Sequence, residues 1–175
     1  MVETLAGHFA KANQLGYVTK DMDRALLHFQ RTMGIQEFTR READSMVDLH
    51  GRTVPFRIEL ALANIGDRQI EIIRPLDGMT DFYFHPGIDL EGRVAALHHL
   101  GVTVEGPESN WEQMQQVVRA AGYDIVLQDQ PEEDPPMRIR FLYADTRADF
   151  GHYLEFIWYD ATAWAWNRSM PDQAR

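Results

Sequence analysis

The sequence predicts an α+β fold made of two tandem modules, each with the element order strand, helix, strand, strand, strand. Matching segments in the two halves indicate this duplication: residues 14–18 (QLGYV) match 99–103 (HLGVT), and 69–73 (QIEII) match 153–157 (YLEFI). In each half the first of these segments is followed by an amphipathic stretch that ends at a glycine, as helices commonly do.

The spacing between matching residues is nearly the same in both halves. Gln14 precedes Glu71 by 57 residues, and His99 precedes Glu155 by 56 residues. One such match arises easily by chance, whereas three matches in register predict a duplicated module. We therefore expect one domain in which two modules form an open barrel around a single cavity, with the modules at residues 1–87 and 88–175.

The first module begins with a strand over residues 14–19 and continues with a capped helix. Asp21 is a good N-cap residue, apolar residues follow it at helical spacing, and Gly34 ends the helix. The rest of the module alternates between strand-forming runs and turn residues. We expect a strand pair within residues 38–49 before a turn at Gly51, then antiparallel strands at 56–63 and 68–73.

The second module repeats this order. It begins with a strand at residues 99–104. Asn110 is expected to cap the next helix, with Gln113 three residues later in the manner of a capping box, and Gly122 ends that helix. The module then finishes with strands at residues 123–128, 138–143 and 153–159.

Two segments lack a regular pattern. Residues 76–87 (LDGMTDFYFHPG) are rich in aromatic side chains, and they either cover a pocket or fold onto the core. The tail after Asp160 contains Trp164 and Trp166, which pack either on the body of the protein or on a second subunit. The sequence leaves both pairs of alternatives open.

Composition and charge exclude several classes of function. The formal net charge of −10 argues against nucleic acid and anionic membranes as partners. The absence of cysteine excludes disulfides, thiolate metal sites and a cysteine nucleophile, and it is typical of a reducing compartment. Residues 1–8 lack the basic and apolar regions of a signal peptide, and no apolar run is long enough to span a bilayer. We therefore expect a cytoplasmic protein.

Two apolar strands are each interrupted by one glutamate. Because alternate residues of a strand share a face, Glu155 lies with Tyr153 and Ile157, and Glu71 lies with Gln69. These faces are expected to line a cavity of mixed polarity. The opposite faces are fully apolar and are expected to pack beneath the helices: Ile70 and Ile72 in the first module, and Leu154, Phe156 and Trp158 in the second.

Pairing of the modules would bring four polar side chains together: Gln14, Glu71, His99 and Glu155. Taken singly, a strand histidine is more often a hydrogen-bonded core residue, and a strand glutamate often faces solvent. Their equivalent positions in a repeat favour a shared site instead. One amide oxygen, two carboxylates and one imidazole suit a divalent ion such as Zn²⁺, Ni²⁺, Co²⁺, Mn²⁺ or Fe²⁺.

The chain carries three recognisable motifs: residues 14–25 (QLGYVTKDMDRA), 98–102 (HHLGV) and 151–155 (GHYLE). Together they resemble the vicinal oxygen chelate superfamily, which includes glyoxalase I, methylmalonyl-CoA epimerase, extradiol dioxygenases and bleomycin-resistance proteins. The resemblance covers nearly the whole chain and implies a glyoxalase-like fold. It also implies metal ligands on the first and last strands of each module, which selects the same four residues, with His99 rather than His98 as the histidine ligand. The family pairs its modules within a chain or across a dimer, and we expect a homodimer.

Some positions differ from those of particular family members. Val18 stands where glyoxalase I usually has an arginine that binds glutathione. Val54 and Pro55 stand where the epimerase typically has a second catalytic glutamate. Gln14 in place of a first histidine argues against dioxygenase chemistry. The family resemblance is therefore more specific for the fold than for the reaction.

The leading hypothesis is a metal-dependent lyase, isomerase or epimerase that enolises a small carbonyl or thioester substrate. The proton is lost next to a metal-bound carbonyl, with Glu155 as the base and Glu71 returning a proton to the opposite face. Candidate substrate-binding residues are Arg57, Glu59 and Tyr153. The alternatives are a non-catalytic protein that sequesters a hydrophobic metabolite or drug, an extradiol-type dioxygenase, and a structural dimerisation module.

Overall fold

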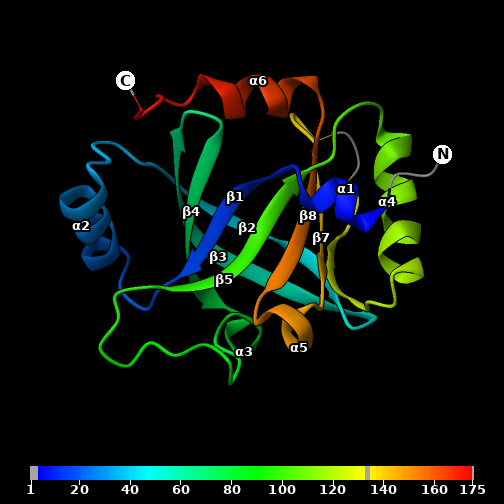
Figure 1. Ribbon diagram of the computed structural model, residues 1–175, viewed down its shortest axis with the longest axis horizontal. Helices are drawn as coiled ribbons and strands as arrows, with labels where there is room; N and C mark the ends of the chain where they lie inside the picture. The colour runs from blue at the N-terminus through cyan, green and yellow to red at the C-terminus, as the bar shows by residue number, and fades with distance from the viewer. Residues whose placement is uncertain (1–3, 133–134, 175) are drawn as a thin grey trace. The chain divides into compact units, whose positions relative to one another are not determined.

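The computed structural model describes residues 4–132 and 135–174. The described residues form six helices and eight strands, so the predicted α+β class is confirmed (Figure 1). They divide into two compact units. Unit 1 comprises the residues through Asn13, Val47–Thr53 and Leu100–Ser169, and unit 2 comprises Gln14–Met46, Val54–His99 and the residues from Met170 onward. The predicted module boundary at residue 87 stays a prediction.

Unit 2 is built on strands in the hydrogen-bonded order β1-β4-β3-β2. The first strand and the last strand of the predicted module, β1 and β4, pair in parallel, and Gly16 lies opposite Glu71. Strand β4 then pairs with β3 in the antiparallel sense that the sequence predicts. The bounds are Ala12–Val18 for β1, Thr39–Leu49 for β2, Arg52–Ile65 for β3 and Arg68–Asp77 for β4.

Helix α2, Met22–Met33, packs on this sheet and has both predicted ends. The Asp21 side chain accepts a hydrogen bond from the backbone N–H of Arg24 at 3.0 Å, and Gly34 ends the helix at φ 75°, in the left-handed region. Burial of each large apolar side chain contributes about 1.5–3 kcal/mol. The buried cluster joins four helix residues to four strand residues: Met22, Ala25, Leu26, Phe29, Ala61, Ala63, Ile70 and Ile72.

Unit 1 contains strands in the order β2-β6-β7-β8-β5, where β2 contributes only its end from Val47 and β5 only its residues from Leu100. Strands β6, β7 and β8 pair antiparallel. The predicted apolar face of the last strand is confirmed, because Leu154, Phe156 and Trp158 pack with α4 residues such as Trp111. The bounds are Ala96–Thr103 for β5, Glu108–Ala120 for α4, Ile125–Asp129 for β6, Ile139–Ala144 for β7 and Tyr153–Tyr159 for β8.

The two segments without a pattern in the sequence each contain a helix. Within residues 76–87, Phe82 and Tyr83 are buried, and their rings lie 5.2 and 5.0 Å from that of His98, so these side chains fold inward. In the tail, the Trp164 ring lies 5.7 Å from that of Tyr159 in the same chain. The helix in residues 76–87 is α3 at Thr80–Tyr83, and the helix in the tail is α6 at Ala161–Ser169. The remaining helices are α1 at Leu5–Phe9 and α5 at Arg147–Phe150.

The predicted capping box at Asn110 is wrong. Helix α4 begins at Glu108, and Pro107 occupies the N-cap position without a side-chain hydrogen bond. Asn110 instead donates from Nδ2 to the carbonyl of Glu105 at 2.8 Å. Gly106, at φ 94°, turns the chain so that this carbonyl lies within reach. The predicted strand pair at residues 38–49 is likewise a single strand, β2, and the turn at Gly51 joins it to β3.

None of the helices formed by residues 4–132 and 135–174 combines the length and the apolar character needed to span a membrane.

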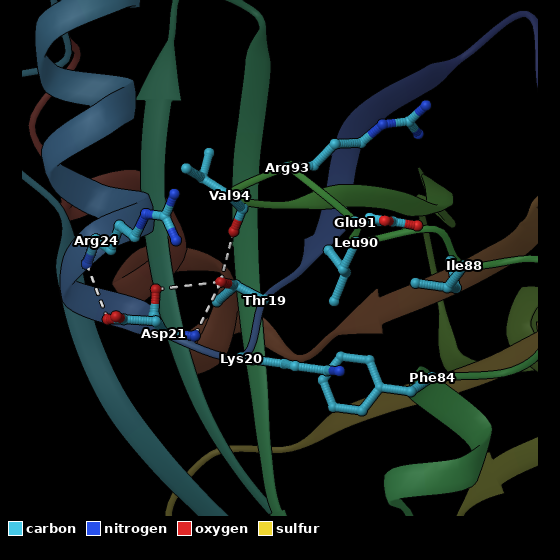
Figure 2. Close-up of a pocket in the computed structure, with 10 residues that line it drawn as sticks. All are labelled: Thr19, Lys20, Asp21, Arg24, Phe84, Ile88, Leu90, Glu91, Arg93 and Val94. Atoms are coloured by element: carbon cyan, nitrogen blue, oxygen red, sulfur yellow. Dashed lines mark hydrogen bonds between the residues drawn. The ribbon is translucent and has the colours of Figure 1, made fainter.

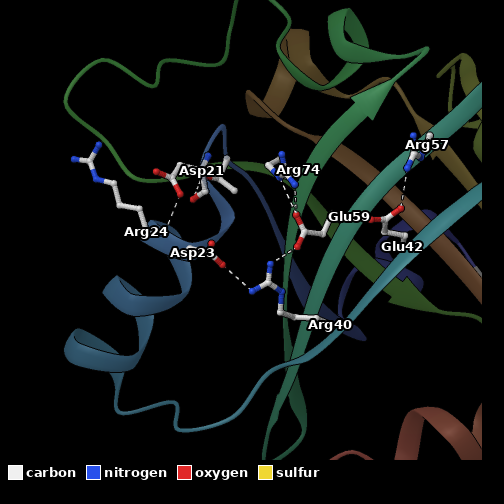
Figure 3. A network of polar contacts seen from close by, with 9 residues as sticks. Asp21, Asp23, Arg24, Arg40, Glu42, Arg57, Glu59 and Arg74 are labelled. Carbon is white, nitrogen blue, oxygen red and sulfur yellow. Dashed lines mark hydrogen bonds and ion pairs between the residues drawn. The ribbon is translucent and has the colours of Figure 1, made fainter.

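A buried glutamate on β3 links elements of unit 2 through two arginine partners (Figure 3). Glu59 is 7% exposed and pairs with Arg40 of β2 and with Arg74 of β4, whose Nη2 lies 2.7 Å from Oε2. Arg40 also reaches Asp23 of α2 at 2.7 Å. Burial by itself raises the pKa of Glu59, but the hydrogen bonds from Arg40 and Arg74 outweigh it, and the pKa lies below its usual range.

We expect Glu59→Gln to lower the free energy of unfolding by about 1–3 kcal/mol at pH 7, because it removes the charge between two arginines. Solvent screening keeps the loss below that of a fully buried pair, since Arg40 and Arg74 are 45% and 40% exposed. The lowered pKa means that this stabilisation is present above the unfolded-state value of 4.5 and is lost as the pH falls through the folded-state pKa. Urea unfolding at pH 7 and in acid measures both effects.

The control is Glu42→Gln, because Glu42 forms an exposed pair with Arg57 at 3.2 Å. We expect it to change the free energy of unfolding by less than about 0.5 kcal/mol. Equal stability of wild type and Glu59→Gln at pH 7 would contradict the role given to Glu59.

Candidate metal centre

Unit 2 contains three of the four predicted metal ligands, each on a different strand. Gln14 lies on β1, Glu71 on β4 and His99 on β5. Gln14 is 5% exposed, His99 is fully buried, and the Glu71 side chain is 12% exposed. The Nε2 atom of His99 lies 3.2 Å from Oε2 of Glu71. The structure therefore brings an imidazole and a carboxylate into contact in a largely buried position.

The close approach of His99 depends on a glycine in the neighbouring strand. A Cβ atom at Gly16 would lie 1.9 Å from Cε1 and 2.1 Å from Nε2 of His99. No side chain larger than hydrogen leaves room for the ring. The sequence signal for this contact is the glycine that occurs in both repeated segments, QLGYV and HLGVT. From the sequence, this glycine counted only as a match between the two halves, and its role in making room for His99 was not predicted.

His98 lies behind His99 as its hydrogen-bond partner. The two Nδ1 atoms are 3.1 Å apart, and Nε2 of His98 is 3.4 Å from the carbonyl oxygen of Phe82. Because a carbonyl only accepts, His98 donates from Nε2, and the neutral ring then accepts at Nδ1 from His99. This leaves Nε2 of His99 to face Glu71 with either a proton or a metal ion. A metal-binding histidine typically donates its other ring N–H in this way.

Gln14 provides an unused acceptor in the same unit. Its Nε2 donates to Oε1 of Gln69 at 2.9 Å. Its own Oε1 is buried and accepts no hydrogen bond from any residue that the structure describes. Buried acceptors normally have a partner, so a cation at this oxygen fits. Imidazole nitrogen, carboxylate oxygen and amide oxygen together suit a borderline divalent metal ion.

Glu155, the fourth predicted ligand, lies on β8 of unit 1 and is 6% exposed. It stands opposite Tyr143 in the pairing of β7 with β8. Tyr153 shares its face of the strand and is buried, with its ring 6.1 Å from that of Tyr143. Burial raises the pKa of Tyr153 to about 12, although the guanidinium of Arg147, 4.6 Å above the ring, opposes this. Glu155 thus lies on a face rich in aromatic side chains.

The other predicted substrate-binding residues already have charged partners. Arg57 pairs with Glu42, and Glu59 pairs with Arg40 and Arg74 on the face of β3 that also carries Ala61 and packs toward α2. Their contact with a substrate stays a prediction, as does that of Tyr153.

A pocket of about 450 Å³ lies beside the end of β1 in unit 2 (Figure 2). Lys20 extends over the Phe84 ring, with Nζ 5.6 Å from the centroid, and Thr19 donates to the carbonyl of Val94 at 2.7 Å. None of the four predicted ligands lines this pocket. Sequence reasoning identified only the aromatic segment that contributes Phe84.

We expect Gly16→Ala to lower the free energy of unfolding by about 1–3 kcal/mol, the usual cost of overpacking, because the new methyl group would overlap the His99 ring. Urea unfolding checks this. The matched control is the same substitution in a His99→Ala background, where the overlap is absent and the additional loss should fall below about 0.5 kcal/mol. An equal loss in both backgrounds would show that the ring is not what excludes a side chain at this position.

Comparison with solved structures places this fold among known ones. A hypothetical protein from Bacillus halodurans C-125 is similar at 18% identity and a TM-score of 0.54, covering 86% of this chain and 94% of its own. Methylmalonyl-CoA epimerase from Mycobacterium tuberculosis matches at 16% identity and a TM-score of 0.51, covering 87% and 90%. A variant of the Streptomyces coelicolor methylmalonyl-CoA epimerase, in complex with 2-nitronate-propionyl-CoA, matches at 14% identity and a TM-score of 0.55. The match covers 87% of this chain and 96% of the epimerase chain.

At these identities the likeness concerns the fold alone. No curated protein matches the sequence. The model of one family, described as the glyoxalase/bleomycin resistance protein/dioxygenase superfamily, matches residues 13–141. That range includes Gln14, Glu71 and His99 and ends before Glu155. Because the match spans well over half of the chain, the protein belongs to the glyoxalase/bleomycin resistance protein/dioxygenase superfamily, as its sequence motifs predicted.

Proposed function

We propose that this protein is a metal-dependent isomerase, epimerase or lyase that removes a proton next to the carbonyl group of a small carbonyl or thioester substrate. The observation that carries the proposal is the buried contact of His99 with Glu71, in the same unit as the unused acceptor of Gln14. Membership of the superfamily supports it. A purely structural module needs no such set of metal-binding atoms.

The proposed ligands are Gln14, Glu71, His99 and Glu155. Glu71, His99 and Glu155 each offer one atom of a kind that binds divalent metals, and Gln14 offers its amide oxygen. Glu155 belongs to the set through the duplication, because it follows His99 by 56 residues as Glu71 follows Gln14 by 57. When bound, the metal would supply Lewis-acid polarisation of a carbonyl oxygen.

The chain's own carboxylates carry the proton steps. Glu155 takes the proton from the carbon next to the carbonyl, and the electron pair of the broken C–H bond moves to form an enolate of the substrate. Glu71, protonated at the start of the cycle, then delivers its proton to the opposite face of the same carbon, which inverts its configuration. Where that carbon also carries a hydroxyl group, delivery of the proton to the former carbonyl carbon, with loss of the hydroxyl proton, isomerises the substrate instead. Proton exchange with solvent returns both carboxyl groups to their starting state. Neither outcome consumes an oxidant or a reductant. Tyr143 and Tyr153 lie beside Glu155, and these aromatic side chains suit a partly apolar substrate.

A thioester is a natural member of this substrate class. The solved structure of the Streptomyces coelicolor epimerase variant is a complex with 2-nitronate-propionyl-CoA, and thioesters have acidic protons next to their carbonyl group. Formation of a homodimer and a cytoplasmic location are further proposals that rest on the sequence.

We expect the purified protein to bind about one divalent ion per chain, and Glu71→Gln and His99→Ala to weaken binding by at least about 10–100-fold. Isothermal titration with Zn²⁺ or Co²⁺ measures this. Glu105→Gln is the matched control, because Glu105 is exposed, and it should leave the affinity unchanged. A wild-type protein that binds none of these ions would contradict the metal site.

We expect Glu155→Gln to slow deuterium incorporation from D₂O into a substrate by about 10²–10⁴-fold, measured at a metal concentration that saturates the variant. The amide keeps an oxygen for the metal but cannot accept the proton. Nuclear magnetic resonance of methylmalonyl-CoA and small 2-oxo compounds in D₂O reports the exchange. Tight binding of an apolar ligand with no exchange in the wild type would favour the sequestration alternative.

A further inference from the structure

We propose that Gln69 and Asn64 are positioning residues that determine which end of the Gln14 amide faces the metal, an inference that rests on the proposed function. The three side chains form a row across three neighbouring strands of unit 2. Gln14 of β1 stands opposite Gln69 of β4, and Gln69 stands opposite Asn64 of β3. The register of the sheet therefore places three amides side by side.

The hydrogen bonds along this row run in one direction. Nε2 of Gln69 donates to Oδ1 of Asn64 at 2.9 Å, and Nε2 of Gln14 donates to Oε1 of Gln69 at 2.9 Å. Each amide has one donating end and one accepting end. Because Asn64 accepts, Gln69 must present its oxygen to Gln14, and Gln14 must present its nitrogen to Gln69.

This direction has a chemical consequence at the end of the row. With its nitrogen engaged by Gln69, Gln14 turns its oxygen away from the row, and that oxygen is the buried acceptor without a hydrogen bond from the described residues. Reversal of the row would present the NH₂ group, which has no lone pair for a metal ion. The row therefore makes Gln14 a ligand by fixing its orientation, and both Gln14 and Gln69 are at most 7% exposed.

The far end of the row is held by the C-terminal segment. The backbone N–H of Gln173 donates to the carbonyl of Asn64 at 2.8 Å, and Asp172 forms an isolated bridge with Asn64. Asp172 also accepts from the backbone N–H of Gly66, in the turn that follows β3, at 2.8 Å. The backbone of Asn64 is thus fixed on the side opposite Gln69. The direction of the row itself follows from the side-chain bond, in which Oδ1 of Asn64 is the atom that accepts from Gln69.

The test measures Zn²⁺ affinity by isothermal titration at one pH. Gln69→Met keeps an unbranched side chain but removes both hydrogen bonds, so Gln14 becomes free to rotate, and we expect about a 10-fold loss, the lower end of the range for outer-shell partners. Asn64→Leu removes the start of the row and should cause a similar or smaller loss. Asn64→Asp keeps an acceptor for Gln69 and therefore preserves the direction, so its affinity should stay within about 3-fold of wild type.

The decisive measurement is a double-mutant cycle with Gln14→Glu. A carboxylate has an oxygen at both ends and needs no orientation, so Gln69→Met should change the Zn²⁺ affinity by less than about 3-fold in that background. A 10-fold loss in both backgrounds, or no loss in the wild-type background, would overturn the positioning role. Thermal unfolding of the metal-free variants confirms that each one folds, and Asn64→Leu serves in place of Gln69→Met if that variant does not.

The two proposals fail in different ways. If the wild type binds Zn²⁺ and Glu71→Gln weakens binding as expected while Gln69→Met does not weaken it, the metal site stands and the positioning role is wrong. If the wild type binds no divalent ion, both the metal site and the positioning role are overturned.

Discussion

The contact between His99 and Glu71 is the constraint on which the rest of unit 2 depends. A buried imidazole 3.2 Å from a carboxylate is stable only when the atoms around it are fixed. Gly16 provides the space for the ring, and His98 provides the acceptor for its other nitrogen. Gln14 lies two residues from Gly16 on the same face of β1, so the strand that admits the imidazole also carries the amide. The same short segment of β1 therefore provides both the space for the His99 ring and the amide of the proposed site.

The two faces of the sheet in unit 2 differ in the side chains that they carry. The face toward α2 has an apolar centre, and its buried carboxylate, Glu59, is held by two arginines. This agrees with the general cost of burying a charge without a partner. The opposite face carries Gln14, Gln69 and Glu71, whose polar atoms contact one another or His99. Charge on the helix face thus stabilises the fold, whereas polarity on the opposite face supplies the atoms that would bind a metal.

Family membership and site chemistry support different parts of the functional proposal. The superfamily match establishes ancestry over residues 13–141, and solved structures at 14–18% identity establish the fold. Neither determines the reaction, because members of one fold host several chemistries. The choice of proton transfer comes from the proposed donor set, in which two carboxyl groups could act as base and acid while an amide oxygen and an imidazole would help to hold a metal ion.

The sequence alone determined the elements whose signals are local. Helix α2 with its caps at Asp21 and Gly34, the run of strand β8, and the apolar faces formed by Ile70, Ile72, Leu154, Phe156 and Trp158 all follow from periodicity and capping. Only the tertiary structure decided the partners of Glu59, the start of α4 at Glu108 rather than after Asn110, and the direction of the Gln14 amide. The physical reason is that these features depend on which side chains meet across strands and turns. A strand's own pattern reveals its faces, whereas the register that places Asn64, Gln69 and Gln14 in one row exists only after three strands have paired.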